Sequence, residues 1–404
     1  MVGRDCREPD AGTGVNALPE SALAELTDLR RELHRAPELS GEEEHTAARI
    51  VAELSGCNAQ IVTGLGGNGV AAIFDSDQPG PSVMFRAELD ALPIAEIGDC
   101  AWRSQMPGKG HLCGHDGHMA ILVGLARLLS ARPPMRGRVV LLFQPAEETG
   151  AGARAVRADP RYRDLVCDWA FALHNLPGAP MGRAWLAPGI VNCASAGMVI
   201  TLTGKTSHAS APEAGVSPAT ALARLIPALE ALSSKTGAGG ASGPIPGPGF
   251  RLATVTHARL GERALGISPG WAELLVTLRA LDDAGLAALM AAARALTEAE
   301  AAAAGLALGI ATEDEFAACS NHPEATAHLA SALDACGLPH ETGGLPMRAS
   351  EDFGLFGRDA KSAMVFLGAG EHHPMLHNPD YDFPDTLLAP GVTLFARLAQ
   401  DLCG

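Results

Sequence analysis

The sequence has no long hydrophobic run and few basic residues for its length. No segment approaches the roughly 18 apolar residues of a membrane span, and residues 1–14 are too polar for a secretory leader, so we expect neither. Thirty Lys and Arg face 46 Asp and Glu, for a formal net charge of −16. A surface this acidic repels phosphate backbones and anionic lipid, which excludes nucleic acid and membranes as expected partners.

The nine cysteines show no pairing pattern typical of a disulfide scaffold. They are scattered over 404 residues and their number is odd. A chain this long does not need disulfide staples, so reduced thiols and a cytoplasmic location are expected. The apolar content of 47% supports one large or two moderate cores, and the length favours two domains.

Two kinds of pattern divide the chain. Residues 18–186 and 315–404 alternate short apolar runs with helical periodicity, which predicts an α/β catalytic domain around a largely buried sheet. Residues 187–314 show the order β-α-β-β-α-β, which is that of the ferredoxin-like split unit. The sequence therefore predicts a second domain inserted into the first.

Local composition refines this division. Residues 1–17 are polar and aperiodic, so we expect a disordered tail there. Leucines then recur at helical spacing from Leu23 to Leu33, which predicts a helix. The Gly- and Pro-rich segment 236–249 is predicted to be a long loop inside the second domain.

Residues 111–118, HLCGHDGH, concentrate thiol and imidazole groups. Cys113 and His115 lie two residues apart on a glycine-containing loop ahead of a helical pattern, so both side chains can point at one centre. An isolated pair of this kind equally describes a buried structural cysteine beside a hydrogen-bonded histidine. Four His and Cys within eight residues favour a transition-metal site.

Other candidate groups follow predicted strands. Glu147 and Glu148 come directly after the apolar run 138–143, at the end of a strand where open α/β sheets place their sites. One carboxylate can bind a metal ion while its neighbour moves protons. His174 ends another predicted strand, and His377 is one of several candidate histidines near the C-terminus.

These motifs resemble, in the same order, those of the hippurate hydrolase and indoleacetyl-amino-acid hydrolase branch of the aminoacylase/carboxypeptidase metallohydrolases. The matching segments are FRAELDALPI (85–94), HLCGHDGH (111–118), QPAEE (144–148), ALHN (172–175), GKTSHASAP (204–212), SEDF (350–353) and LHNPDYDFPD (376–385). The resemblance covers nearly the whole chain. It implies a zinc-peptidase-like α/β catalytic domain with an inserted ferredoxin-like lid, which often forms the interface of a homodimer or higher homo-oligomer.

The resemblance also implies roles for eight residues. The implied ligands of two divalent ions, Zn, Mn, Co or Ni, are Cys113, His115, Glu148, His174 and His377. Glu147 would act as general base and acid, Asp90 would orient a ligand from outside the coordination shell, and His208 on the lid would reach the substrate carbonyl. The implied reaction cleaves the amide bond of N-acyl amino acids, or related small N-acyl amines, through a metal-activated water.

The lid departs from the family pattern at residues that face substrate in the family. Glu213 stands where a second His is expected, and Gly266 stands where an Asn able to hold a substrate carboxylate is usual. Arg279 matches a basic residue of the family. We therefore expect the amine half of the substrate to be atypical, and the need for a free carboxylate stays open.

Three other functions stay open. A dipeptidase or carboxypeptidase of the same fold would act on dipeptides rather than acetyl-amino acids. A non-catalytic metal-binding homologue would have no use for a spare base such as Glu147. A thiol amidase using Cys113 with His115 would resist chelators and be sensitive to alkylation.

Overall fold

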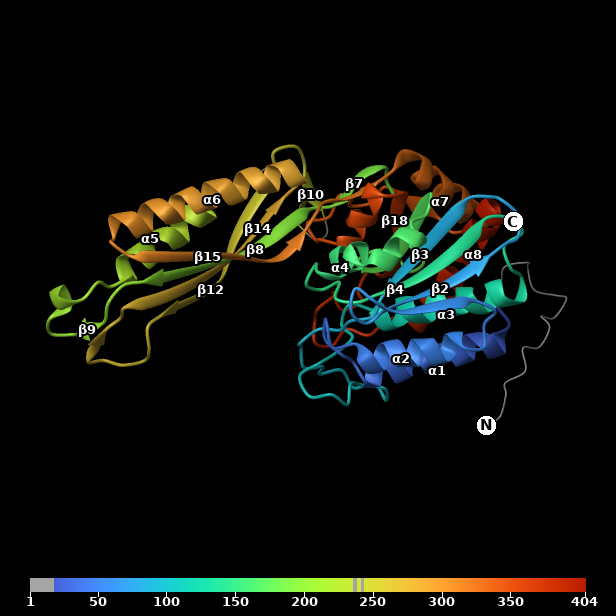
Figure 1. Ribbon diagram of the computed structural model, residues 1–404, viewed down its shortest axis with the longest axis horizontal. Helices are drawn as coiled ribbons and strands as arrows, with labels where there is room; N and C mark the ends of the chain where they lie inside the picture. The colour runs from blue at the N-terminus through green and yellow to red at the C-terminus, as the bar shows by residue number, and fades with distance from the viewer. Residues whose placement is uncertain (1–17, 235–237, 241–242) are drawn as a thin grey trace. The chain divides into compact units, whose positions relative to one another are not determined.

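The chain folds into two compact units, coloured along the sequence in Figure 1. The computed structural model describes residues 18–234, 238–240 and 243–404. The first unit comprises residues up to Val191 together with 320–345 and 352–404, and the second comprises 192–319 and 346–351. The predicted tail, 1–17, lies outside the described residues. None of the helices in the described ranges is long and apolar enough to cross a membrane.

The first unit is built on an eight-stranded mixed sheet. Its order is β1 (Gln60–Leu65), β2 (Gly69–Asp75), β4 (Arg138–Gln144), β3 (Ser82–Glu88), β5 (Trp169–Pro177), β18 (Lys361–Gly370), β6 (Ala184–Trp185) and β17 (His340–Glu341). The neighbouring strands β4, β3, β5 and β18 run parallel. Their side chains are almost entirely buried, which explains their continuous apolar runs.

Helices cover both faces of this sheet. One face packs with five helices into a single apolar core: α1 (Glu20–Arg35), α2 (Glu44–Leu54), α3 (His115–Ala131), α7 (Pro323–Ala335) and α8 (Leu388–Cys403). The other face carries α4 (Gly152–Ala158) and the 3-10 turns η1 (Pro160–Leu165) and η3 (Asp352–Arg358). The predicted α/β layer architecture is thus present, with the sheet in the middle.

The second unit contains an antiparallel sheet and two helices in the chain order β-α-β-β-α-β. Its antiparallel sheet runs β12 (Arg251–Leu260), β14 (Trp271–Ala280), β8 (Ala194–Thr203) and β15 (Ala307–Phe316). Helices α5 (Ala219–Glu230) and α6 (Asp283–Ala303) share one apolar core with these strands. The order of the four strands, second-third-first-fourth in the chain, is that of the split βαβ fold.

Short elements complete the two units. They are β7 (Gly189–Asn192), β9 (Ser207–His208), η2 (Pro212–Ala214), β10 (Ala238–Gly240), β11 (Gly243–Ile245), β13 (Ile267–Ser268), β16 (Cys319–Asn321) and η4 (Asp385–Leu387). The predicted loop 236–249 falls partly outside the described residues, and its described part includes the antiparallel pair β10 and β11.

The observed units differ from the expected boundaries in three segments: residues 187–191 belong to the first unit, and residues 315–319 and 346–351 belong to the second. The guanidinium of Arg279 on β14 donates to the carbonyl oxygen of Arg348 at 3.0 Å and to Oγ of Ser350 at 2.8 Å. These side-chain contacts bridge about 70 positions of sequence, and periodicity carries no information about them.

Candidate metal centre

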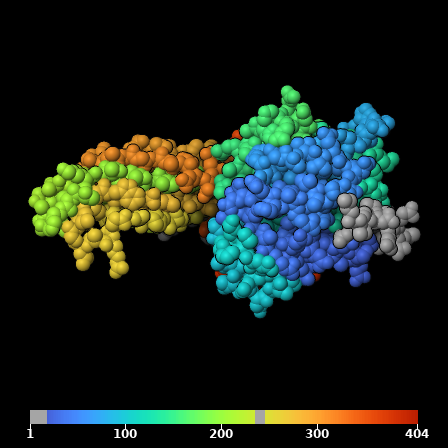
Figure 2. Space-filling model, turned by 60° about the horizontal axis from the view of Figure 1, so that its bottom comes forward, coloured from blue at the N-terminus to red at the C-terminus, as the bar shows by residue number. Residues whose placement is uncertain are grey.

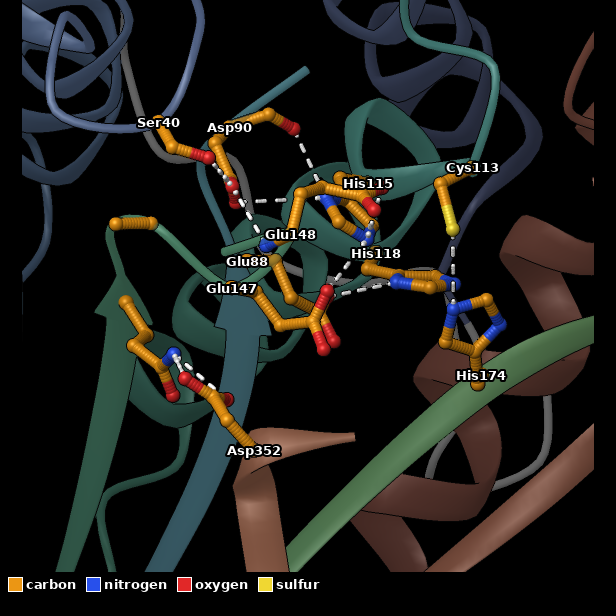
Figure 3. Close-up of polar contacts among 12 residues, drawn as sticks. Ser40, Glu88, Asp90, Cys113, His115, His118, Glu147, Glu148, His174 and Asp352 are labelled. Atoms are coloured by element: carbon orange, nitrogen blue, oxygen red, sulfur yellow. Dashed lines mark hydrogen bonds and ion pairs between the residues drawn. The ribbon is translucent and has the colours of Figure 1, made fainter. Parts of the chain in front are cut away.

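The candidate site lies at the carboxyl edge of the parallel strands. Asp90 follows β3, Glu147 and Glu148 follow β4, His174 lies near the end of β5, and His377 follows β18. Parallel strands end at the same edge of a sheet, so segments far apart in sequence meet there. The start of α3 brings His115 to the same place, as Figure 3 shows.

A glycine permits the sharp turn that presents Cys113. Gly114, the residue before α3, has φ of 91°, a conformation that residues with a side chain rarely adopt. A Cβ at this position would also collide with the side-chain amide of Asn175. That amide donates to the carbonyl oxygen of Cys113 at 2.7 Å. The turn is therefore fixed to β5, the strand that carries His174.

The five expected ligands converge. Cys113 Sγ lies 3.5 Å from His174 Nε2, and His377 Nε2 lies 3.5 Å from Glu148 Oε2. His115 Nε2 lies 3.9 Å from Glu148 Oε1. The donor atoms form overlapping groups within 4.8 Å of one another: Cys113 with His115 and His174, and Cys113 with Glu148 and His377. Two groups that share a thiol suit a pair of neighbouring ions.

The hydrogen bonding of the two His115 ring nitrogens shows whether these residues fit a metal ion. Its Nδ1 lies 2.8 Å from the carbonyl oxygen of Asp90, so this nitrogen donates. Its Nε2 is buried and has no hydrogen-bond partner among the described residues. A buried ring nitrogen beside a thiol and carboxylates matches the mixed N, S and O donors that transition metals prefer. The residues present therefore fit the expected ions.

The electrostatics of the cluster also suit added positive charge. Burial raises the pKa of the Cys113 thiol well above its ordinary value, and the nearby carboxylates of Glu148 and Glu147 raise it further. For His115, burial alone would lower the pKa, but Glu88, Asp90 and Glu148 raise it to about 10. The thiol and the imidazole thus hold protons that a bound cation would displace.

Buried groups behind the ligands fix their orientation, as Figure 3 shows. Asp90 Oδ2 accepts hydrogen bonds from Ser40 Oγ at 2.7 Å and from the backbone N–H of Glu148 at 2.9 Å. Asp90 therefore touches both the His115 ring, through its carbonyl oxygen, and the Glu147-Glu148 loop. Such contacts set the direction in which ligands point.

A second buried chain of contacts was not expected from the sequence. Glu88 accepts from Arg86 and lies 2.7 Å from His118 Nδ1. His118 Nε2 accepts the backbone N–H of Asn175 at 3.2 Å, and the Tyr381 hydroxyl donates to the Asn175 side chain. The segments matched family motifs, but only the fold shows that their side chains form one network.

His208 lies in the second unit, outside this cluster. It is exposed on β9, and its Nδ1 lies 2.7 Å from Ser210 Oγ. β9 pairs with β13, and the N–H of Ala209 donates to the carbonyl oxygen of Gly266 at 3.0 Å. In Figure 2 the light-green segment that contains β9 stands at one end of the second unit. His208 and Gly266 thus lie on one small surface. Glu213, which is close to His208 in the sequence, is also exposed.

Comparison with known proteins agrees with this geometry. The model of a family described as Peptidase family M20/M25/M40 matches residues 84–401. Hippurate hydrolase of Campylobacter jejuni is 29% identical and covers 95% of this chain and 99% of its own. IAA-amino acid hydrolase ILR1-like 5 of Arabidopsis thaliana is 29% identical and covers 93% of this chain and 86% of its own.

Among solved structures, the chain is similar to the Bacillus subtilis YXEP protein, described as a dinuclear metal binding peptidase from M20 family. The TM-score is 0.77 at 25% identity, with 95% of this chain and 99% of that one covered. Two findings thus meet at the same residues: the matched family segment contains all five expected ligands, and the structure brings them together.

Proposed function

The chain belongs to peptidase family M20/M25/M40, and from this premise we propose that it cleaves the amide bond of N-acyl amino acids or related small N-acyl amines. One observation carries the proposal: Cys113, His115 and His174 come together in a buried cluster beside a pair of adjacent carboxylates. Relatives named as hydrolases of hippurate and of IAA-amino acids support amide hydrolysis as the reaction class.

Two divalent ions, Zn, Mn, Co or Ni, would be held by Cys113, His115, Glu148, His174 and His377. When bound, such ions lower the pKa of a water molecule and polarise a carbonyl group. The protein residues then need to position the substrate and to move one proton. The ligand set is our proposal, and the pairwise distances within the cluster support it.

Glu147 is the proposed proton carrier. Its side chain is 8% exposed and lies beside His115, with Oε2 at 4.0 Å from Nε2. It would accept a proton from the attacking water and deliver it to the leaving amine nitrogen, so that one carboxylate serves as base and then as acid. His208 is the proposed donor to the developing oxyanion, a task that needs an exposed N–H able to meet the substrate.

The lid surface is proposed to select the amine half of the substrate. Gly266 has open space where a Cβ would be added, so an amide side chain that could hold a carboxylate is absent there. Glu213 adds a negative charge close to His208 in the sequence. We propose that the enzyme accepts N-acyl amines with an unusual polar group or with none, and that Gly266→Asn increases preference for a free carboxylate.

Hydrolysis of paired substrates tests the function. N-acetyl and N-benzoyl amino acids would each be compared with the amide that lacks the carboxylate, using chelated enzyme reloaded with Zn, Mn, Co or Ni. Turnover restored by metal supports the proposal, and a preference for the carboxylate-free compounds supports the lid argument. No turnover with any metal contradicts the proposal, and turnover of dipeptides alone would favour the peptidase alternative.

The thiol amidase alternative is weakened by the state of Cys113. Burial and the neighbouring carboxylates raise the pKa of its thiol, whereas a nucleophilic cysteine needs a lowered pKa. Chelator-resistant, alkylation-sensitive turnover would reverse this conclusion. A cytoplasmic location and self-association through the second unit stay predictions; size-exclusion chromatography with light scattering tests the latter.

A further inference from the structure

Glu43 is a fully buried carboxylate more than a hundred residues from the candidate base in sequence. Its side chain is 0% exposed, although it stands at the residue before α2. A short carboxylate, Asp, commonly caps its own helix at this position, but the longer Glu43 side chain makes no such hydrogen bond. Burial of a charge is costly unless the charge is hydrogen-bonded, so the contacts it does make explain its presence.

Three N–H groups point at this carboxylate. Oε1 accepts from the backbone N–H of Gly41 at 2.9 Å and of Ala146 at 2.8 Å. Oε2 accepts from the side-chain amide of Asn68 at 2.9 Å. The Ala146 contact joins the start of α2 to the loop after β4, directly beside Glu147.

Ala146 has a backbone conformation that needs support. Its φ is 50°, in the left-handed region that residues with a Cβ rarely occupy. Such a conformation persists when the surroundings hold it, and it clusters at functional sites. Both backbone groups of Ala146 are held: the N–H by Glu43, and the carbonyl oxygen by the N–H of Gly152 at 2.9 Å. The strained residue sets the direction in which the chain presents Glu147.

We propose that Glu43 is a positioning residue for Glu147, acting by holding Ala146 in its left-handed conformation. This inference rests on the proposed function, because it takes Glu147 as the proton carrier. Asp90 fixes the N–H of Glu148 two residues later, so the two carboxylates Glu43 and Asp90 grip the loop on both sides of Glu147. Displacement of a reacting group by about 1 Å costs on the order of a hundredfold in rate.

The main test is Glu43→Ala in the full-length, metal-loaded enzyme, assayed on the N-acyl compound that the wild type hydrolyses. We expect kcat to fall about 10- to 100-fold, with KM within about threefold of wild type because Glu43 does not touch substrate. Bound metal, measured by elemental analysis, should be unchanged. Glu43→Gln keeps an oxygen acceptor and should recover most of kcat. Glu42→Ala, which removes the exposed carboxylate next in sequence, is the matched control and should behave as wild type.

Ala146→Gly separates positioning from general stability. Glycine adopts positive φ without the Cβ penalty, so the loop no longer depends on Glu43. In the double variant, kcat should recover at least tenfold over Glu43→Ala, and the fall in Tm caused by Glu43→Ala should shrink. A double variant as slow as Glu43→Ala, or a Glu43→Ala variant as fast as Glu42→Ala, overturns the proposal.

Two further measurements cover the remaining outcomes. If Glu43→Ala does not fold, Glu43→Asp shortens the arm and keeps the charge, and the same recovery by Ala146→Gly is expected. If the wild type hydrolyses no compound, the proposed function has failed, whereas the coupling between the two substitutions in thermal unfolding still tests the contact itself. Independent effects of the two substitutions on Tm would then overturn it.

Discussion

The expected reactive groups of the two units differ in how firmly the protein holds them. In the first unit, His115 and Asp90 are at most 1% exposed, and Asp90 is hydrogen-bonded both to His115 at the start of α3 and to the loop after β4. In the second, His208 is exposed, and its side chain is held by a neighbour two residues away. A metal centre must be rigid to set coordination geometry, whereas a substrate-facing group can be ordered by the ligand it meets. On this comparison the proposed metal centre is preorganised, and the exposed surface around His208 is the proposed adaptable contact with substrate.

The largest effect is expected at the rigid centre itself. Glu147→Gln removes the proton acceptor while nearly preserving shape, so kcat should fall about a thousandfold or more. The metal content should stay that of the wild type because Glu147 is not a proposed ligand. Glu148→Gln is the comparison, since it should lose metal as well as activity. Equal metal loss in both variants would contradict the separate roles given to these two carboxylates.

Removal of metal should destabilise the first unit and leave the second unchanged. Ions present at a thousandfold excess over their Kd stabilise the folded state by about 4 kcal/mol, and all five proposed ligands lie in the first unit. Hydrogen exchange with and without chelator measures this unit by unit. Protection in α3 and β4 should fall, while protection in β8 and β14 should not change; a uniform change would show that the units do not respond separately.

The buried His34 predicts how the stability of the first unit depends on pH. Burial alone would lower the pKa of His34, but the carboxylates of Asp116 and Glu96 raise it to about 9. Because the folded-state pKa lies above the ordinary value of about 6.5, the protonated form favours folding. Its stabilisation, at most about 3 kcal/mol, is full below pH 6.5 and is lost as the pH rises to 9.

Urea unfolding of the metal-saturated protein between pH 6 and 9.5 checks this expectation. The wild type should lose stability across the window more steeply than His34→Gln, in which Asp116 and Glu96 lose their protonated partner. Because other groups titrate in the same range, the difference between the two slopes is the measurement. Parallel slopes would mean that His34 is not charged in the folded protein.

The smallest effect is expected at the adaptable surface. His208→Ala should lower kcat about 100-fold through loss of an oxyanion donor. It should not change Tm, because the side chain is exposed and contacts Ser210. His257→Ala, which removes another exposed histidine of the second unit, is the matched control. A fall in Tm in His208→Ala would show that this residue also stabilises the fold of the second unit.

Sequence patterns predicted the elements of both units better than their supporting contacts. Apolar runs located β3, β4 and β5, and leucine spacing located α1, because burial of a strand or helix face leaves a period in the sequence. The same helix also buries His34, whose partner Asp116 lies 82 positions away. No local pattern encodes such a pair, and Glu43 with Ala146 is a second case.

For the site, the family motifs pointed to residues that the structure brings together in the first unit. They did not predict the left-handed conformation of Ala146 or the chain from Glu88 to Asn175, because these depend on how strands meet in space. The role of His208 and the identity of the ligands stay predictions, which the variants above address.

The pairing of β5 with β18 governs when the centre can form during synthesis. These adjacent parallel strands are about 190 residues apart in sequence, and contacts of such separation form slowly. The whole of the second unit is encoded between them, so its chain is complete before β18 is synthesised. At synthesis rates of about 5 to 20 residues per second, the nascent chain carries Cys113 and His115 on the order of ten seconds or more before His377 emerges. An early metal ion would therefore meet an incomplete set of the proposed ligands, so the order of translation would delay assembly of the proposed centre until β18 and the segment after it have been made.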